Sequence, residues 1–175
     1  MEAALVLFDE KGYDETTVAD IAARAGLTRR TFFRYFPDKR EVLFRGAGNL
    51  EAVFVEAVAG APSEASPIAA VRAGLAASCG IFDGLHPIVR IRARVVASNP
   101  ELQERELIKL EHLSAAVASA LEARSVDPSL AALASDLGVR VFRLAFAEWV
   151  AQDDPAGLNV TIEKVFGELQ VLLAD

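Results

Sequence analysis

Cysteine, histidine and methionine are all scarce in this sequence. Of its 175 residues, one is a cysteine (Cys79), one is a methionine and two are histidines. A single cysteine cannot form an internal disulfide, so we expect a reducing, cytoplasmic setting in which Cys79 is a small buried side chain. The two histidines, His86 and His112, are far apart and belong to no cluster with metal-ligand spacing. The sequence therefore predicts no metal site and no cofactor.

Long apolar runs and the common catalytic motifs are also missing. No apolar run approaches the roughly 18 residues that cross a membrane, and the start "MEAALVLFDEKG" lacks the basic region of a signal peptide. We expect no membrane partner. There is no serine-centred hydrolase turn and no phosphate-binding glycine loop, so we predict no catalytic residues. Because distant residues can still assemble into a site, an all-α small-molecule-binding protein or enzyme without DNA-binding activity remains the alternative function.

What the sequence does have is positive charge concentrated in one stretch. The whole chain carries a formal net charge of -7, yet residues 24–45 contain seven basic side chains against two acidic ones. The basic residues are Arg24, Arg29, Arg30, Arg34, Lys39, Arg40 and Arg45. A basic patch on an otherwise acidic protein suits contact with a polyanion such as nucleic acid. On charge alone, a solvated helix face explains the stretch equally well.

Capping residues and chain breaks predict helices throughout. The stretch "AALVLFDEKG" ends at Gly12, and glycine readily adopts the left-handed backbone conformation that ends many helices. The stretch "TVADIAARAG" begins with Thr17 as N-cap, and Asp20 completes a capping box. No segment shows the alternation typical of a strand. The predicted fold class is therefore all-α. Further helices are expected at 28–35, from Asp38 to about 59, and, beyond the linker "GAPSEASP", at 68–82, 88–98, 101–124, 129–152 and 158–173.

Two of these helices are short and are joined by the turn "AGLT", which is a helix-turn-helix pattern. The second helix of such a unit enters the major groove of DNA. On "TRRTFFRYF" we expect Phe32 and Phe36 to pack inward, and their expected partners are Ile21 and Leu5. The outward-facing side chains are then Arg29, Arg30, Phe33 and Arg34.

The pattern "T-V-A-D-I-A-x-x-A-G-L-T-x-x-T-F-F-R-Y-F-P-D-K-x-x-V-L" resembles the DNA-binding region of TetR-type transcriptional regulators. The resemblance covers residues 4–43 densely, and the remainder fits by its helical layout. It implies an N-terminal helix-turn-helix DNA-binding domain of three helices at 1–45, followed by a larger helical effector-binding and dimerisation domain at 46–175. It also implies a ligand-responsive regulator, most often a repressor. Such a regulator binds a near-palindromic double-stranded DNA operator as a homodimer and is released by a small molecule.

The resemblance also implies roles for individual residues in DNA binding. Arg29, Arg30, Phe33 and Arg34 occupy positions that read bases, and Thr17, Thr28, Thr31, Tyr35 and Lys39 occupy positions that contact phosphates. Phe33 stands where the family usually has tyrosine, so only apolar contact, for instance with a thymine methyl, is expected from it. Thr17 and Thr28 also serve as helix N-caps. The family usually carries a basic arm before the first helix, and the sequence leaves open whether the stated start is late or the arm is lacking.

For the larger domain the resemblance implies two functions, dimerisation and effector binding. The residues expected in a dimer interface are Leu133, Leu137, Val141, Leu144, Ile162, Val165, Phe166, Leu169 and Leu172. The alternative for these side chains is a larger monomeric core. The residues expected to line a pocket for a small apolar or amphipathic effector are Phe54, Phe82, Phe142, Phe146, Trp149, Arg90 and Arg94. Ordinary core packing for the aromatic side chains, and solvation for the arginines, are the alternatives.

Overall fold

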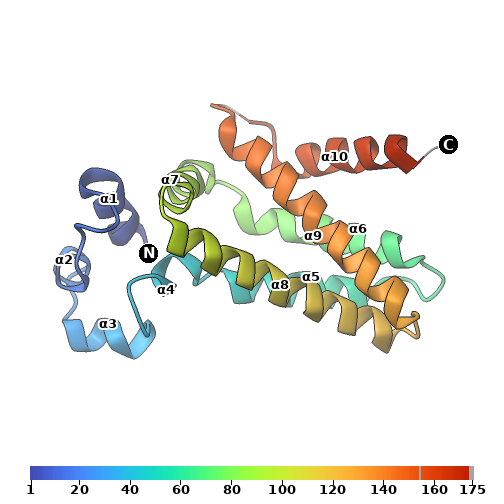
Figure 1. Cartoon of the computed structure of the whole chain (residues 1–175), viewed down its shortest axis with the longest axis horizontal. Helices are drawn as coiled ribbons and strands as arrows, with labels where there is room; N and C mark the ends of the chain where they lie inside the picture. Colours follow the sequence, from blue (N-terminus) through green and yellow to red (C-terminus); the bar gives the residue numbers. More distant parts are fainter. Residues whose placement is uncertain (154, 174–175) are drawn as a thin grey trace. The chain divides into compact units, whose positions relative to one another are not determined.

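The computed structural model describes residues 1–153 and 155–173, and the side chains of residues 47, 48 and 173 are not described. Every regular element in this part of the chain is a helix (Figure 1), so the predicted all-α fold class is confirmed. The predicted C-terminal domain also includes Asp154 and residues 174–175, which lie outside the described residues.

The helices follow the predicted boundaries closely. They are α1 (Glu2–Lys11), α2 (Val18–Arg24), α3 (Arg29–Tyr35), α4 (Glu41–Phe44), α5 (Ala47–Ala59), α6 (Pro67–Cys79), the 3-10 helix η1 (Gly80–Phe82), α7 (His86–Ala97), α8 (Pro100–Ala123), α9 (Pro128–Ala151) and α10 (Leu158–Leu173). One prediction was wrong: the helix expected from Asp38 to about 59 is interrupted by a turn at Arg45 and Gly46. Glycine is a poor helix former, by about 1 kcal/mol relative to alanine, which explains the break.

The chain divides into two compact units. The first contains Met1–Ala47 together with Pro87–Leu107, and the second contains Gly48–His86 together with the residues from Ile108 onward. Residues 87–107 therefore pack with the helix-turn-helix, although the sequence assigned them to the larger domain. The division into functional domains at 1–45 and 46–175 stays a prediction.

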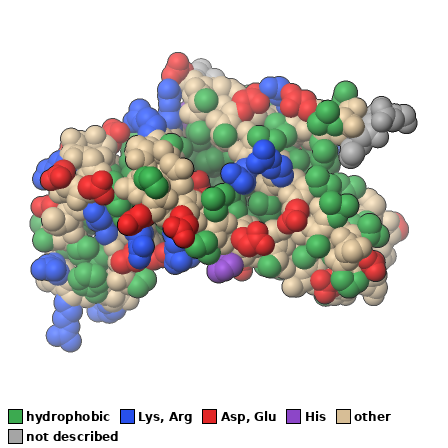
Figure 2. Space-filling model, viewed as in Figure 1, with side chains coloured by type: hydrophobic (Ala, Val, Ile, Leu, Met, Phe, Trp, Pro, Cys, Tyr) green, Lys and Arg blue, Asp and Glu red, His purple; other side chains and the backbone are tan. Residues whose placement is uncertain are grey.

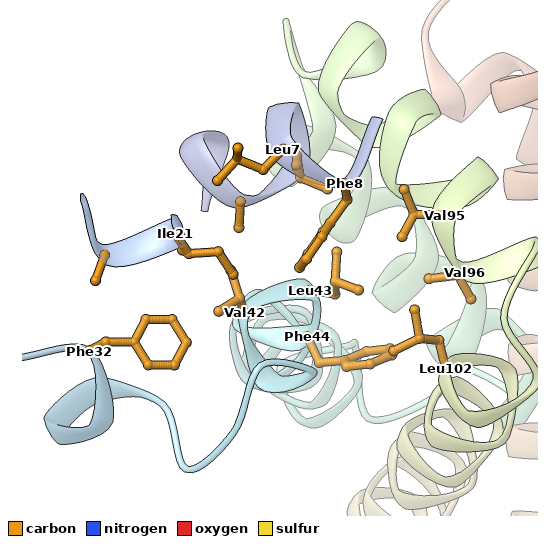
Figure 3. Packing of buried hydrophobic residues seen from close by; sticks show 13 residues of the cluster. Leu7, Phe8, Ile21, Phe32, Val42, Leu43, Phe44, Val95, Val96 and Leu102 are labelled. Carbon is orange, nitrogen blue, oxygen red and sulfur yellow. The ribbon is translucent and has the colours of Figure 1, made fainter. Parts of the chain in front are cut away.

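The first unit is built on one hydrophobic cluster, shown in Figure 3. Phe32 of α3 points into this cluster, and the centre of its ring lies 5.1 Å from that of the half-buried Phe36. Leu5 and Ile21 are buried in the same cluster. The predicted inward packing of the two phenylalanines is thus confirmed. The other labelled members are Leu7, Phe8, Val42, Leu43, Phe44, Val95, Val96 and Leu102.

Local capping fixes the ends of α1 and α2. The backbone N–H of Asp20 donates to the Thr17 hydroxyl (3.1 Å), and the backbone N–H of Thr17 donates to the Asp20 carboxylate (2.9 Å), so the predicted capping box is confirmed. Gly12 ends α1 with φ 86° and ψ 157°. This positive φ favours glycine, but the conformation is extended rather than the left-handed helix end that we expected.

The second unit is held by close helix contacts around α9, which packs on both α6 and α10. Gly74 of α6 lies against the ring of Phe54, where a Cβ atom would be 2.2 Å from a ring carbon. Gly138 of α9 lies against Val71 at a similarly short distance (2.3 Å). These two glycines therefore allow helices to approach closely.

Cys79 lies near the end of α6 and is buried, as predicted. Its Sγ donates to the carbonyl oxygen of Leu75 (3.3 Å). Burial, with a further contribution from the Asp83 carboxylate, raises the pKa of Cys79 to about 11. The thiol therefore stays protonated near neutral pH.

Within residues 1–153 and 155–173, no single helix is both long and apolar enough to cross a membrane. One pair of helical segments with a bend between them, Pro67–Phe82 and His86–Ala97, is long and apolar enough only when the two are taken together.

Candidate nucleic-acid interface

Helix α3 presents an exposed polar and basic surface. Its first turn is fixed by Thr28, whose hydroxyl accepts a hydrogen bond from the backbone N–H of Thr31 (3.1 Å) and lies 3.0 Å from the Thr31 hydroxyl. Phe32 anchors the opposite side of the helix in the core. The four predicted base-reading side chains, Arg29, Arg30, Phe33 and Arg34, are all exposed. The helix is thus divided into a buried face and a face available to a partner.

Phe33 is the unusual member of this surface because it is apolar and 48% exposed. Together with Arg30, Thr31 and Arg34 it lines a shallow depression of about 490 Å³. An exposed phenyl group flanked by arginines has no hydrogen bond to offer. It is therefore suited to an apolar group that lies beside polar or anionic groups.

Arg34 and Tyr35 form a pair on the same helix. The Arg34 guanidinium donates a hydrogen bond to the Tyr35 hydroxyl (3.1 Å) and lies 4.9 Å from the centre of the Tyr35 ring. Both side chains are exposed. Their polar ends are therefore held together at the surface, which suits a shared anionic partner.

The basic residues of the segment 24–45 do not all contribute to this surface. Arg24 pairs with Glu10 (2.7 Å), and Arg40 pairs with Asp38 (2.7 Å). By contrast, Figure 2 shows Lys and Arg side chains protruding at the lower left, where α3 lies in Figure 1. Positive charge is thus gathered over α3, which supports contact with a polyanion there.

The structure gives Lys39 partners other than a phosphate. Its ammonium donates to the carbonyl oxygens of Tyr13 (2.7 Å) and Thr16 (3.1 Å), with that of Asp14 at 3.5 Å. It also lies 4.1 Å from the centre of the Tyr13 ring. The sequence did not predict these intramolecular contacts, because nothing in it relates Lys39 to residues more than 20 positions earlier. The contact of Lys39 with a phosphate stays a prediction.

The remaining predicted phosphate contacts lie at helix ends or on α3. Thr17 caps α2 and Thr28 caps α3, so the capping role that we expected for both is confirmed. The hydroxyl of Thr17 also donates to the Asp20 carboxylate (2.7 Å). Their contacts with phosphate, like those of Thr31 and Tyr35, stay predictions.

Four of the predicted pocket residues come together in the second unit. The rings of Phe82, Phe142, Phe146 and Trp149 form a cluster, with ring centres 5.4 to 6.2 Å apart in the contacts that involve Phe82. The sequence did not assign His86 to this cluster, yet its ring centre lies 4.7 Å from that of Trp149 and its Nε2 lies 3.2 Å from the Trp149 carbonyl oxygen. The position of His86 at the start of α7 was readable from the sequence, but its contact with α9 was not.

The other predicted pocket residues lie elsewhere. Phe54 is fully buried against Gly74, so it fills the core between helices. Arg90 and Arg94 lie on the part of α7 that belongs to the first unit. The Arg94 guanidinium pairs there with the Asp9 carboxylate (3.0 Å). Helical periodicity indicates which face of a helix a residue occupies but not which helix packs against that face, so the sequence alone does not separate these residues from the aromatic cluster.

The predicted dimer-interface residues separate into two sets. Four of them are buried within the single chain: Val141, Ile162, Val165 and Phe166. The helices α6, α9 and α10 pack on one another, and this contact buries those side chains. Leu133, Leu144 and Leu172 are exposed, and Leu137 and Leu169 are half-buried. This second set is accessible at the surface of the single chain, and its contact with a second copy stays a prediction.

Known proteins are similar to this chain in the N-terminal helix-turn-helix region and, more weakly, over most of its length. Residues 1–45 match the model of the family described as "Bacterial regulatory proteins, tetR family". The chain is 29% identical over 187 residues to the HTH-type transcriptional regulator TcmR of Streptomyces glaucescens, a similarity that covers 95% of this chain and 79% of TcmR. It is 34% identical over 103 residues to the HTH-type transcriptional regulator EthR of Mycolicibacterium smegmatis, covering 56% of this chain and 46% of EthR.

Among solved structures, FadR of Thermus thermophilus, a TetR-family transcriptional repressor, resembles this chain with a TM-score of 0.60 and 26% identity. That similarity covers 98% of this chain and 90% of FadR. The family model thus identifies residues 1–45 with the TetR family of bacterial regulatory proteins, and the similarity to the transcriptional regulator TcmR extends over nearly the whole sequence.

Proposed function

We propose that this protein is a ligand-responsive repressor that binds a near-palindromic operator as a homodimer and is released by a small molecule. The observation that carries the proposal is the exposed face of α3, on which Arg30 and Arg34 line one depression with the apolar ring of Phe33 and Arg29 is also exposed. An arginine side chain grips the O6 and N7 atoms of guanine with two hydrogen bonds, and a phenyl ring contacts only apolar groups. The same face thus combines two kinds of base recognition.

A homodimer follows from the requirement for two such helices. Two recognition helices must lie about one DNA turn apart, roughly 34 Å, to enter successive major grooves on one side of the duplex. We assign the interface to the exposed faces of α9 and α10. Leu133, Leu137 and Leu144 form one stripe on α9, since they are spaced four and seven residues apart. On α10 the exposed apolar side chains are Val160, Val171 and Leu172.

The effector that we propose is a small apolar or amphipathic molecule bound in the second unit. The aromatic cluster around Trp149 supports this, because apolar rings with few polar groups favour such ligands. FadR of Thermus thermophilus was solved in complex with lauroyl-CoA, an amphipathic molecule. Trp149 is the sole tryptophan, so its fluorescence should report occupancy.

A gel shift with the intergenic region upstream of the protein's own gene tests the DNA-binding part of the proposal. Specific binding of one near-palindromic fragment over random DNA is expected, with an affinity that falls steeply as salt rises, since each neutralised phosphate contributes about -0.9 to the slope of log K against log salt. An affinity that does not depend on salt, or an absence of binding to any fragment, would refute the proposal. The second result would favour the alternative of a small-molecule-binding protein without DNA-binding activity.

Release by the effector has its own test. A compound that changes Trp149 fluorescence should weaken operator binding by the same factor by which the operator weakens compound binding, because coupling between two sites is reciprocal. Equal affinity of the compound for free and DNA-bound protein would contradict release, even if the compound binds.

A further inference from the structure

Lys39 is half-buried against the connection between α1 and α2. Three carbonyl oxygens of this connection, those of Tyr13, Asp14 and Thr16, lie 2.7, 3.5 and 3.1 Å from its Nζ atom. The ring of Tyr13 covers a further side at 4.1 Å. An ammonium group has three N–H donors, and here three carbonyls face it. The group is therefore directed into the protein rather than toward a phosphate outside it.

The aromatic side of this site is itself fixed. The Tyr13 ring lies 5.1 Å from that of the buried Phe8, centre to centre. Burial raises the pKa of Tyr13 to about 12, so the phenol is neutral near physiological pH. The ring therefore attracts the ammonium through its face and not through a phenolate charge.

The connection that Lys39 holds leads directly into the cap of α2. Thr16 is fully buried, and its hydroxyl donates to the carbonyl oxygens of Gly12 (2.8 Å) and Leu7 (3.2 Å). The next residue is Thr17, which begins the capping box. On the other side of the contact, Lys39 directly follows Asp38, whose carboxylate accepts hydrogen bonds from the backbone N–H groups of residues 40 and 41 at the start of α4. One ammonium thus joins the entry to α2 and the entry to α4.

We infer that Lys39 is a positioning residue for DNA binding, which sets the entry to α2 relative to that of α4 through the backbone of residues 13–16, and is not itself a phosphate ligand. The inference rests on the proposed function, because it assumes that Thr17 and the exposed face of α3 contact an operator. Tyr13 contributes to the same positioning, because its carbonyl oxygen and its ring both contact the Lys39 ammonium.

Salt dependence separates positioning from phosphate contact. We would measure operator affinity of the full-length protein by fluorescence anisotropy over a series of KCl concentrations, at a temperature well below unfolding. The variants are Lys39→Met, Tyr13→Leu with Tyr13→Phe as its aromatic control, and Lys11→Met as a control that removes one positive charge from the exposed end of α1. Lys39→Met and Tyr13→Leu should each bind about tenfold more weakly with the slope of log K against log salt unchanged. Tyr13→Phe and Lys11→Met should bind like the wild type.

Two results would overturn the inference. A phosphate ligand would lower the slope by about 0.9 for each subunit when Lys39 is replaced, and so by about 1.8 for a dimer. An unchanged affinity of the folded Lys39→Met protein would show that Lys39 serves stability alone. If the wild type itself binds no operator, the proposed function fails and the inference with it. A lowered slope in a wild type that does bind would refute only the inference.

Hydrogen exchange gives a measurement that does not depend on DNA. Lys39→Met should speed exchange of the Asp20 and Ile21 amides, which donate to Thr17, relative to amides in α9. Uniform acceleration over the whole chain would indicate general destabilisation, and no acceleration would indicate that Lys39 does not hold this segment. Either result would contradict the positioning role. Tyr13→Leu provides the second variant if Lys39→Met fails to fold.

Discussion

The ring of Phe33 stands edge-on to that of Phe32, with ring centres 5.5 Å apart and planes at 88°. Phe32 is buried in the core of the first unit, so it forms a fixed support for the exposed neighbour. Edge-to-face contact is a favoured geometry for aromatic pairs. The position of the Phe33 ring is thus set before any partner arrives.

We predict that Phe33 reads the methyl group of a thymine. Replacing the contacted thymine of the operator by uracil removes one methyl, worth about 0.8 kcal/mol when buried, or roughly a fourfold loss of affinity. Phe33→Ala should bind more weakly and should not distinguish thymine from uracil. The comparison needs four anisotropy titrations, two proteins against two operators. Equal sensitivity of both proteins to the uracil change would contradict the assignment.

Arg30 is expected to contribute base specificity. Arg30→Ala should lose about 1–3 kcal/mol on the operator and discriminate less between operator and random DNA. Arg24→Ala removes the same charge from the same segment, but Arg24 pairs with Glu10, so it serves as the matched control. Competition titrations with random DNA measure both quantities. Equal losses on operator and random DNA for Arg30→Ala would show that Arg30 contacts the backbone instead.

Leu133 should be essential for the dimer and dispensable for the fold of a single chain. Its side chain is 58% exposed, so Leu133→Asp places no charge in the core of one chain, but it would bury an unpaired charge between two copies. Sedimentation should show a monomer whose circular dichroism spectrum remains helical. Leu107→Asp, at a comparably exposed position of α8, should remain dimeric. A dimeric Leu133→Asp protein would place the interface elsewhere.

The contact between Gly74 and Phe54 predicts a stability effect. Gly74→Ala introduces a methyl group 2.2 Å from a ring carbon of a fully buried phenylalanine, which requires repacking and should cost about 1–3 kcal/mol. Gly46→Ala, where the added atom meets nothing within 4 Å, should be neutral or slightly stabilising. Urea unfolding of both variants measures the difference. The reverse order of stabilities would refute the packing argument.

The capping box also predicts a pH dependence. Hydrogen bonds from the Thr17 hydroxyl and backbone N–H lower the pKa of Asp20 below its ordinary value of 3.8. A lowered pKa means that this carboxylate stabilises the folded state above its ordinary pKa, and that the contribution is lost as pH falls through the lowered value. Thermal unfolding from pH 5 downward should therefore show a smaller loss of stability for Asp20→Asn than for the wild type. Parallel curves for the two proteins would show that the box contributes nothing.

Local features of this fold were predictable from the sequence because their causes are local. The ends of α2 are defined by Thr17, Asp20 and the following turn, which interact with neighbours three or four residues away. The inward packing of Phe32 and Phe36 follows from their spacing of four residues on one helix. The break at Gly46 was the exception. There the apolar pattern continues through the turn, so periodicity alone suggested one long helix.

Tertiary relationships were not predictable in the same way. Lys39 contacts a connection more than 20 positions earlier, and Arg94 contacts Asp9, so no pattern in the sequence relates the partners. The two sides of α10 posed a similar difficulty. Ile162 and Val160 are both apolar, yet only the first is buried, since the difference depends on where α6 and α9 lie.

Because the thiol of Cys79 is buried, the native protein should not react with thiol reagents. Buried, protonated near neutral pH and hydrogen-bonded to Leu75, the thiol presents no nucleophile to thiol reagents. A cysteine introduced at an exposed site outside the proposed interface, such as Leu107, would therefore carry a probe selectively, without removal of the natural residue. Spin labels at that position would report the separation of the two subunits of the proposed homodimer directly in solution.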